Sequence, residues 1–267
     1  MPTGKVRSYS DLTRRLIRLA ERIPEIDLHL LGKVRAGAER YPFWTLTTPA
    51  GPKKRTICLS GGIHGDEPAG VEAVLGALEM LKKRPRWIDR SQFTIFPCIN
   101  PYGYEYGTRQ NRSKIDLNRQ FMRAHPAGEV RLMKRVLDGR TFDLSIEFHE
   151  DIDTPGFYLY ELSKDPKRAI AKKIIRRVEK KYPINLGEEI EGAPAKGGVI
   201  SPDLSSGFFK ERLARRRQWP HAIYQYKQGT PHTLTSETPI HLGAKERVEI
   251  HLIVLKTAME GLIAPRE

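Results

Sequence analysis

Cysteine and long apolar runs are scarce in this sequence. Among 267 residues there are two cysteines, Cys58 and Cys98, each in an expected central strand, where a cysteine usually acts as a small buried apolar residue. Two such cysteines exclude a disulfide framework and favour a reducing compartment, the cytoplasm. No apolar run approaches the ~20 residues of a membrane helix, and the N-terminus lacks an apolar signal segment. We therefore expect a soluble cytoplasmic protein without a membrane partner.

Acidic residues are also fewer than basic ones. The chain has 46 Lys and Arg against 32 Asp and Glu, a formal net charge of +14. Part of the excess lies in two basic runs, residues 164–181 and 212–217. A basic surface attracts anionic partners and can bind nucleic acid without specificity, but no recognition motif accompanies these runs. We interpret them as solvated faces and expect no specific nucleic-acid partner.

Strands alternate with helices along the chain, which predicts an α/β fold with a mainly parallel (mixed) twisted sheet and helices on both faces. No internal repeat or linker interrupts the pattern, so residues 1–267 are expected to form a single domain. The least regular stretch, 186–206, is interpreted as a surface loop that shapes a pocket. Strands are expected at 26–31, 41–48, 55–59, 92–99, 142–148, 157–161 and 231–237, and helices at 12–20 (capped by Ser10), 68–81, 128–137, 164–181 and 248–262.

A histidine and a carboxylate follow the strand expected at 55–59. Two glycines allow a sharp turn there, Pro68 suits the first position of a helix, and Asp66 or Glu67 suits its cap. His64 and Glu67 should therefore lie on a loop at the carboxyl end of a strand, where open α/β sheets place ligand sites. Both side chains are good Zn²⁺ ligands, although His-x-x-Glu alone also fits a capping carboxylate beside a loop histidine.

A second polar stretch, residues 100–119, follows the next strand. Its arginines and asparagines include Arg109, Arg112, Asn118 and Arg119. Arginine offers a fixed fork to a carboxylate and asparagine adds a neutral donor, whereas the Asn-Pro and Tyr-Gly pairs in this stretch are also ordinary turn sequences. The stretch is either a carboxylate site or a surface turn with solvated arginines.

Two further polar side chains end expected strands. His149 should lie at the same sheet edge as His64, with Asp143 or Glu150 available to orient its second ring nitrogen. Glu237 ends a β-branched strand immediately before a proline, where a carboxylate has no evident structural role.

Together these motifs resemble the zinc carboxypeptidase superfamily, including its murein-peptide amidase branch and the related succinylglutamate desuccinylase and aspartoacylase group. The matching stretches occur in family order at 61–67, 100–109, 116–119, 147–149 and 235–237. The resemblance implies the α/β fold expected above and a zinc-dependent hydrolase. One Zn²⁺ ion is implied as cofactor.

Carried over residue by residue, the resemblance implies His64, Glu67 and His149 as the zinc ligands, with water in the remaining position. Glu237 is implied as the general base that takes a proton from this water and passes it to the leaving amine. A carboxylate suffices as base because zinc lowers the pKa of bound water.

The arginine-rich stretch also has implied roles. Arg109 matches the arginine that stabilises the oxyanion, and Arg112 is close enough in sequence to take that role or to bind substrate. Asn118 and Arg119 match the pair that binds the terminal carboxylate of the substrate. These four side chains complete the implied site.

The sequence departs from the family pattern in three places. The segment between Arg109 and Asn118 is short compared with pancreatic-type carboxypeptidases, which resembles the bacterial amidase pattern. The tyrosine that closes over substrate has no secure counterpart, and Tyr224 and Tyr226 are candidates. His149 is followed by Glu150 and Asp151 instead of small residues, and this extra acidity is compatible with a tuned metal, a basic substrate or a second ion.

Three functions remain open at this point. The first is a zinc peptidase that cleaves a peptide or peptide-like amide bond next to a free carboxylate. The second is an amidohydrolase of small N-acyl amino acids, which would use the same metal and base. The third is a non-catalytic basic binding module, against which the presence of Glu237 argues. The sequence does not determine the oligomeric state.

Overall fold

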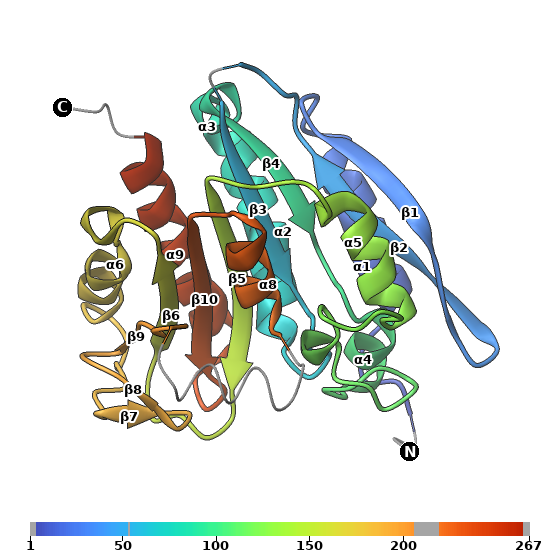
Figure 1. The fold of residues 1–267 in the computed structure, drawn as a ribbon. Coiled ribbons are helices and arrows are strands. Elements are labelled where there is room, and N and C mark those ends of the chain that lie inside the picture. Colours follow the sequence, from blue (N-terminus) through green and yellow to red (C-terminus); the bar gives the residue numbers. More distant parts are fainter. Residues whose placement is uncertain (1–3, 53, 206–218, 264–267) are drawn as a thin grey trace.

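A mixed eight-stranded sheet forms the centre of the protein in the computed structural model, which describes residues 4–52, 54–205 and 219–263 (Figure 1). Its strand order is β1-β2-β4-β3-β5-β10-β6-β9. The four central strands run parallel, whereas β1, β2 and β6 introduce antiparallel pairs. The strands are β1 (Asp27–Ala36), β2 (Glu39–Thr47), β3 (Arg55–Gly61), β4 (Ser91–Phe96), β5 (Leu144–Asp151), β6 (Tyr158–Ser163), β9 (Val199–Ile200) and β10 (His232–Pro239), and β7 (Glu189–Ile190) pairs separately with β8 (Ala193–Pro194). The expected α/β fold is confirmed.

Helices cover both faces of this sheet. Helices α1, α2 and α9 lie behind the sheet in Figure 1, and α5 and α8 lie in front of it. The described helices are α1 (Tyr9–Ala20), α2 (Pro68–Lys83), α3 (Pro85–Arg90), α4 (Pro101–Tyr106), α5 (Gly128–Leu137), α6 (Ala171–Val178), α8 (His221–Gln228) and α9 (Ala244–Ile263), with 3-10 turns η1 (Leu117–Arg119) and η2 (Pro166–Arg168). None of these helices is long and apolar enough to cross a membrane.

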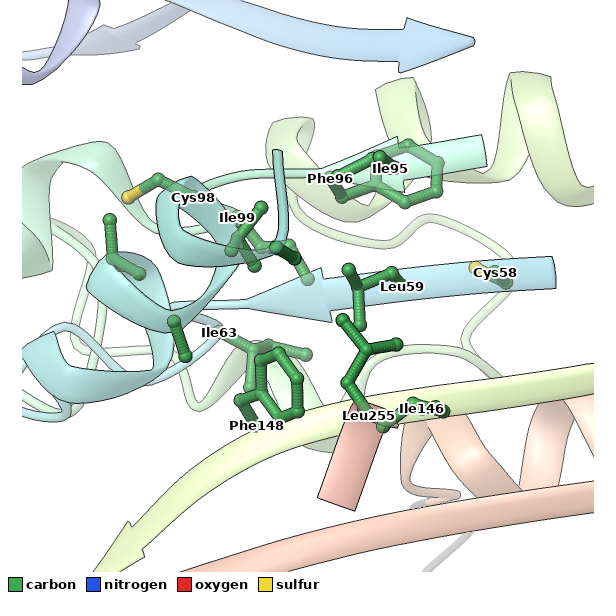
Figure 2. Packing of buried hydrophobic residues seen from close by; sticks show 14 of the residues in the cluster. Cys58, Leu59, Ile63, Ile95, Phe96, Cys98, Ile99, Ile146, Phe148 and Leu255 are labelled. Atoms are coloured by element: carbon green, nitrogen blue, oxygen red, sulfur yellow. The ribbon is translucent and has the colours of Figure 1, made fainter. Parts of the chain in front are cut away.

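The main core lies between the central strands and the helices α2 and α9. Leu59 of β3, Ile146 of β5 and Leu255 of α9 are buried side by side (Figure 2). Cys58 and Cys98 are buried and unpaired, and burial raises the pKa of both thiols. The core therefore holds the central strands rigidly and fixes the edge where they end.

Some local predictions need correction. Ser8, not Ser10, caps α1, since its hydroxyl accepts a hydrogen bond from the Asp11 amide. The basic stretch 164–181 forms a 3-10 turn, which Asp165 caps and Pro166 begins, and then the short helix α6, because the extended backbone of Ala169 separates the two. Helix α8 was not predicted, and the basic run 212–217 lies outside the described residues.

The side chain that caps the start of α2 also differs from the prediction. Glu67 occupies the N-cap position, but its side chain makes no capping hydrogen bond. The Ala69 amide instead donates to Oε1 of Glu150, at 2.6 Å. Glu150 of β5 therefore caps α2, and the Glu67 side chain contacts His64 and His149 instead.

Candidate active site

The carboxyl ends of β3, β5 and β10 meet at one edge of the sheet, where a cavity of about 730 Å³ opens. Parallel pairing sets the neighbours at this edge: Glu237 of β10 lies in register with His149 of β5. The loop after β3 brings His64 and Glu67 to the same cavity. The polar side chains at the ends of these strands therefore line the same cavity.

His64, Glu67 and His149 are buried together. Nδ1 of His64 lies 2.6 Å from Oε1 of Glu67, and Nδ1 of His149 lies 2.9 Å from Oε2. One donor atom from each residue lies within 4.8 Å of the others. Burial alone would raise the pKa of Glu67, but the two histidines outweigh burial and hold its pKa well below the usual value.

The second ring nitrogens face other carboxylates. Nε2 of His64 lies 3.2 Å from Oδ1 of Asp116, and Nε2 of His149 lies 3.5 Å from Oε2 of Glu147. These contacts fix both rings so that the Nδ1 atoms point inward. Asp116 and Glu147 were not assigned this role from sequence.

The carboxylates expected to orient His149 are engaged elsewhere. Asp143 binds the Arg55 side chain and the Thr56 amide. Glu150 caps α2 and contacts Arg247. Strand alternation contained the missing signal, because Glu147 points to the same face as His149 two residues away, whereas Glu150 points to the other face.

Glu237 lies on the cavity wall next to these residues. Burial is the main reason why the pKa of its carboxyl is raised to about 8; His149 opposes this rise, and the nearby Glu67 and Asp151 add to it. A carboxyl with such a pKa can accept and release a proton near neutral pH. Its environment therefore differs sharply from that of Glu67, although both line the same cavity.

Residues that are paired between β10 and β6 form the rest of this cavity wall. Glu237 faces Tyr158 across the β10–β6 pair, and Thr235 and Thr233 follow down the same face. Tyr160 and Leu162 of β6 continue the wall in register with these two threonines. The wall thus becomes uncharged with distance from the histidines.

The predicted arginines occupy different places. Arg109 lines the cavity; its Nη1 lies 3.3 Å from Oε1 of Glu67 and its Nε lies 3.5 Å from Oδ2 of Asp116. Arg112 lies over the ring of Tyr102, 5.8 Å from its centroid, and is not among the described residues that line the cavity.

Asn118 and Arg119 are both brought to the cavity by η1. The η1 turn is held by Asp116, whose Oδ1 accepts from the Asn118 amide at 2.9 Å. Oδ1 of Asn118 accepts from the His221 amide at 2.8 Å, which leaves its Nδ2 amide group as the donor end. A carboxylate would meet donors from both side chains here.

The tyrosines at the cavity differ from those suggested by sequence. Tyr224 donates to Asp138, and Tyr226 lies beneath Lys164; neither is among the described lining residues. Tyr158 and Tyr160 line the cavity instead, and the Tyr158 hydroxyl donates to Oδ2 of Asp151 at 2.9 Å. These two tyrosines come from β6, which the sequence marked only as a strand.

The donor set is chemically suited to zinc. Two imidazole nitrogens and one carboxylate, all buried and converging, form the three-ligand set of many catalytic zinc sites. Asp116 and Glu147 lie beside the second ring nitrogens of the two histidines, where such ligands usually have an outer partner. The residues present therefore fit the ion that the motifs imply.

Comparison with known sequences gives a consistent result. Residues 15–130 match the zinc carboxypeptidase family. Carboxypeptidase E of Caenorhabditis elegans is 30% identical over 141 residues, covering 44% of this chain and 30% of that protein. An inactive metallocarboxypeptidase of Saccharomyces cerevisiae is 37% identical over 68 residues, covering 23% of this chain and 16% of that protein. The chain thus spans less than a third of the length of these two relatives.

Solved structures extend the likeness to nearly the whole chain. A candidate metallopeptidase from Shewanella baltica superposes with a TM-score of 0.79 at 20% identity, covering 96% of this chain and 92% of that chain. Carboxypeptidase A of Helicoverpa armigera gives a TM-score of 0.69 at 14% identity, covering 97% and 74%. These findings confirm the resemblance that the motifs indicated: residues 15–130 match the zinc carboxypeptidase family in sequence, and the described chain has the fold of that superfamily.

Proposed function

We propose that this chain is a zinc-dependent hydrolase that cleaves a peptide or peptide-like amide bond next to a free carboxylate. The observation that carries the proposal is the convergence, in one cavity, of a His–Glu–His donor set, a carboxyl with a raised pKa and an Asn–Arg pair. Each group alone has a structural explanation. Their common location at the end of three parallel strands does not.

His64, Glu67 and His149 would hold the ion. Zinc bound there supplies a Lewis acid and lowers the pKa of water in its coordination sphere. Glu237, across the strand pair from His149, takes a proton from the attacking water and passes it to the leaving amine. Burial raises the pKa of Glu237 in the metal-free chain, and a cation bound beside it would favour the carboxylate form that accepts the proton.

The basic residues act on the substrate. The Arg109 side chain is about half exposed and faces the cavity beside Glu67, so its N–H groups can stabilise the negative charge that develops on the scissile carbonyl oxygen. Asn118 and Arg119 offer donors to the terminal carboxylate. Binding at that carboxylate would fix which amide bond lies beside Glu237.

The direct test uses pairs of substrates that differ only at the carboxyl end. The zinc-loaded protein is assayed with N-acylated dipeptides that carry a free carboxylate and with the same compounds as C-terminal amides. Hydrolysis of the free acids, with little or none of the amides, is expected because only the free acids engage Asn118 and Arg119. Equal hydrolysis of both would contradict the assigned carboxylate site.

The same assay separates the proposed peptidase from a deacylase of small substrates. N-acyl amino acids with a single residue are included as a third group. Preferential hydrolysis of this third group would replace the peptidase assignment with the deacylase. Absence of hydrolysis in all three groups by zinc-loaded protein would favour a binding module.

A further inference from the structure

Behind the cavity wall lies a buried group of polar residues that the proposed reaction does not use. Glu147 is 2% exposed and His221 is completely buried. Oε1 of Glu147 lies 2.9 Å from Nδ1 of His221, an ion-pair distance without hydrogen-bond geometry. Neither residue is among the described lining of the cavity.

Strand geometry explains why Glu147 has no access to solvent. It lies in the middle of β5, between Ser60 of β3 and Thr235 of β10. Alternation along the strand forces its side chain onto the face that carries His149. A carboxylate buried in this way is costly unless charged or donor groups meet both oxygens.

The two oxygens of Glu147 meet two different histidines. Oε2 lies 3.5 Å from Nε2 of His149, the nitrogen on the opposite side of the ring from Glu67. Oε1 faces His221, at the first residue of α8. Both oxygens of this buried side chain therefore face histidine ring nitrogens.

His221 also reaches the substrate side of the site. Its backbone N–H donates to Oδ1 of Asn118, as described above. Its ring is fixed by stacking on Phe121, with centroids 5.0 Å apart, and by Gln225, whose Nε2 lies 3.2 Å from Nε2 of His221. The start of α8 is therefore held between β5 and η1.

We propose that Glu147 is a positioning residue for the metal ligand His149, and that His221 holds Glu147 while its backbone orients Asn118. One buried chain of contacts would then align the metal ligand and the carboxylate-binding amide. This inference rests on the proposed function, because it assigns a role to residues behind that same site.

The chain contains a matched control for this arrangement. Glu161 of β6 is also a buried carboxylate paired with a histidine, His232, at 2.8 Å. Its Oε1 accepts in addition from the Ile170 and Ala171 amides at the start of α6. These contacts of Glu161 lie at His232 and at the start of α6, whereas Glu147 contacts His149, so we expect Glu161 to have a structural role.

The test measures zinc affinity by competition with a chelator, without substrate, in the wild-type chain, Glu147→Gln and Glu161→Gln. We expect Glu147→Gln to bind zinc about 10- to 100-fold more weakly, and Glu161→Gln to match the wild type. The unfolding temperature of each metal-free protein is measured in parallel. A merely structural Glu147 would lower that temperature and leave zinc affinity unchanged.

A second variant keeps the test decisive if Glu147→Gln does not fold. His221→Phe retains the stacking on Phe121 and the backbone N–H to Asn118, but removes the nitrogen that faces Glu147. We expect weaker zinc binding and an altered visible spectrum of the Co²⁺-substituted protein, because His149 is then less well oriented.

The outcomes separate this inference from the function on which it rests. If Glu147→Gln and His221→Phe, or whichever of them folds, bind zinc as tightly as the wild type, the positioning role is wrong. The proposed function would not be affected by that result. No zinc uptake by the wild-type chain would overturn the proposed function, and the positioning role with it.

Discussion

Two buried histidines lie on opposite faces of the same strand pair, β5 and β10. His149 faces the cavity and is surrounded by Glu67, Glu237 and Glu147, which raise its pKa although burial alone would lower it. His251 of α9 packs on the other face, where its ring lies 4.8 Å from that of Phe148, and burial lowers its pKa to about 3.

The groups that contact the two histidine rings also differ in charge. His251 binds two neutral hydroxyls, with Nδ1 2.8 Å from Oγ of Ser236 and Nε2 3.3 Å from Oγ1 of Thr238. His149 lies between carboxylates on both sides. Burial therefore does not distinguish these two histidines, whereas the charge of the groups around each ring does.

The largest expected effect is a loss of turnover in Glu237→Gln. Ser236, the adjacent residue on the opposite face of β10, provides the comparison. Glu237→Gln should retain zinc and lower kcat by about 10²- to 10⁴-fold, because the proposed general base is lost. Its neighbour Ser236 binds His251, so Ser236→Ala should keep kcat and lower the free energy of unfolding by about 1–3 kcal/mol. Steady-state kinetics and denaturant unfolding measure the two effects, and an unchanged kcat in Glu237→Gln would sink the assignment of the base.

A smaller effect is expected at the carboxylate site. Arg119→Ala removes the proposed charged donors to the substrate carboxylate and should weaken binding by about 1.5–3 kcal/mol, a rise in KM of about 10- to 100-fold. The effect should be confined to substrates with a free carboxylate. A similar rise in KM for the C-terminal amides would show that Arg119 acts in another way.

A third effect concerns the pH dependence of stability and the face of the sheet that packs on α9. The pKa of His251 is lower in the folded chain, about 3, than in the unfolded chain, about 6.5. Between these values the unfolded state binds more protons, so this residue makes stability fall as pH decreases from about 6.5 toward 3. His251→Gln should flatten that part of the stability profile of the metal-free protein, as measured by denaturant unfolding at several pH values.

A profile that is as steep in His251→Gln as in the wild type would contradict the neutral, buried state of His251. The comparison is made without metal, so that loss of a bound ion at low pH does not contribute.

Features that depend on local sequence were predictable. Helix α5 has the predicted bounds, 128–137, because its apolar spacing and its ends are local signals. The common location of His64, His149 and Glu237 followed from a single rule, that parallel strands end at the same edge of a sheet.

Features that depend on distant contacts were not predictable. The His221 amide meets Asn118 across 103 positions in the chain, and nothing in the sequence around either residue marks that contact. Arg112 and Arg109 lie three positions apart, but only the turn geometry places Arg109 in the cavity and Arg112 over Tyr102. Such contacts are set by packing of whole elements, not by a local pattern.

The proposed zinc site can be tested by the zinc content of protein purified without chelator. Elemental analysis is applied to the wild type, His149→Ala and His251→Ala. We expect about one zinc ion per chain in the wild type and in His251→Ala, and none in His149→Ala. Zinc that persists in His149→Ala, or a wild-type chain that takes up no zinc when it is added, would show that His64, Glu67 and His149 do not form the zinc site.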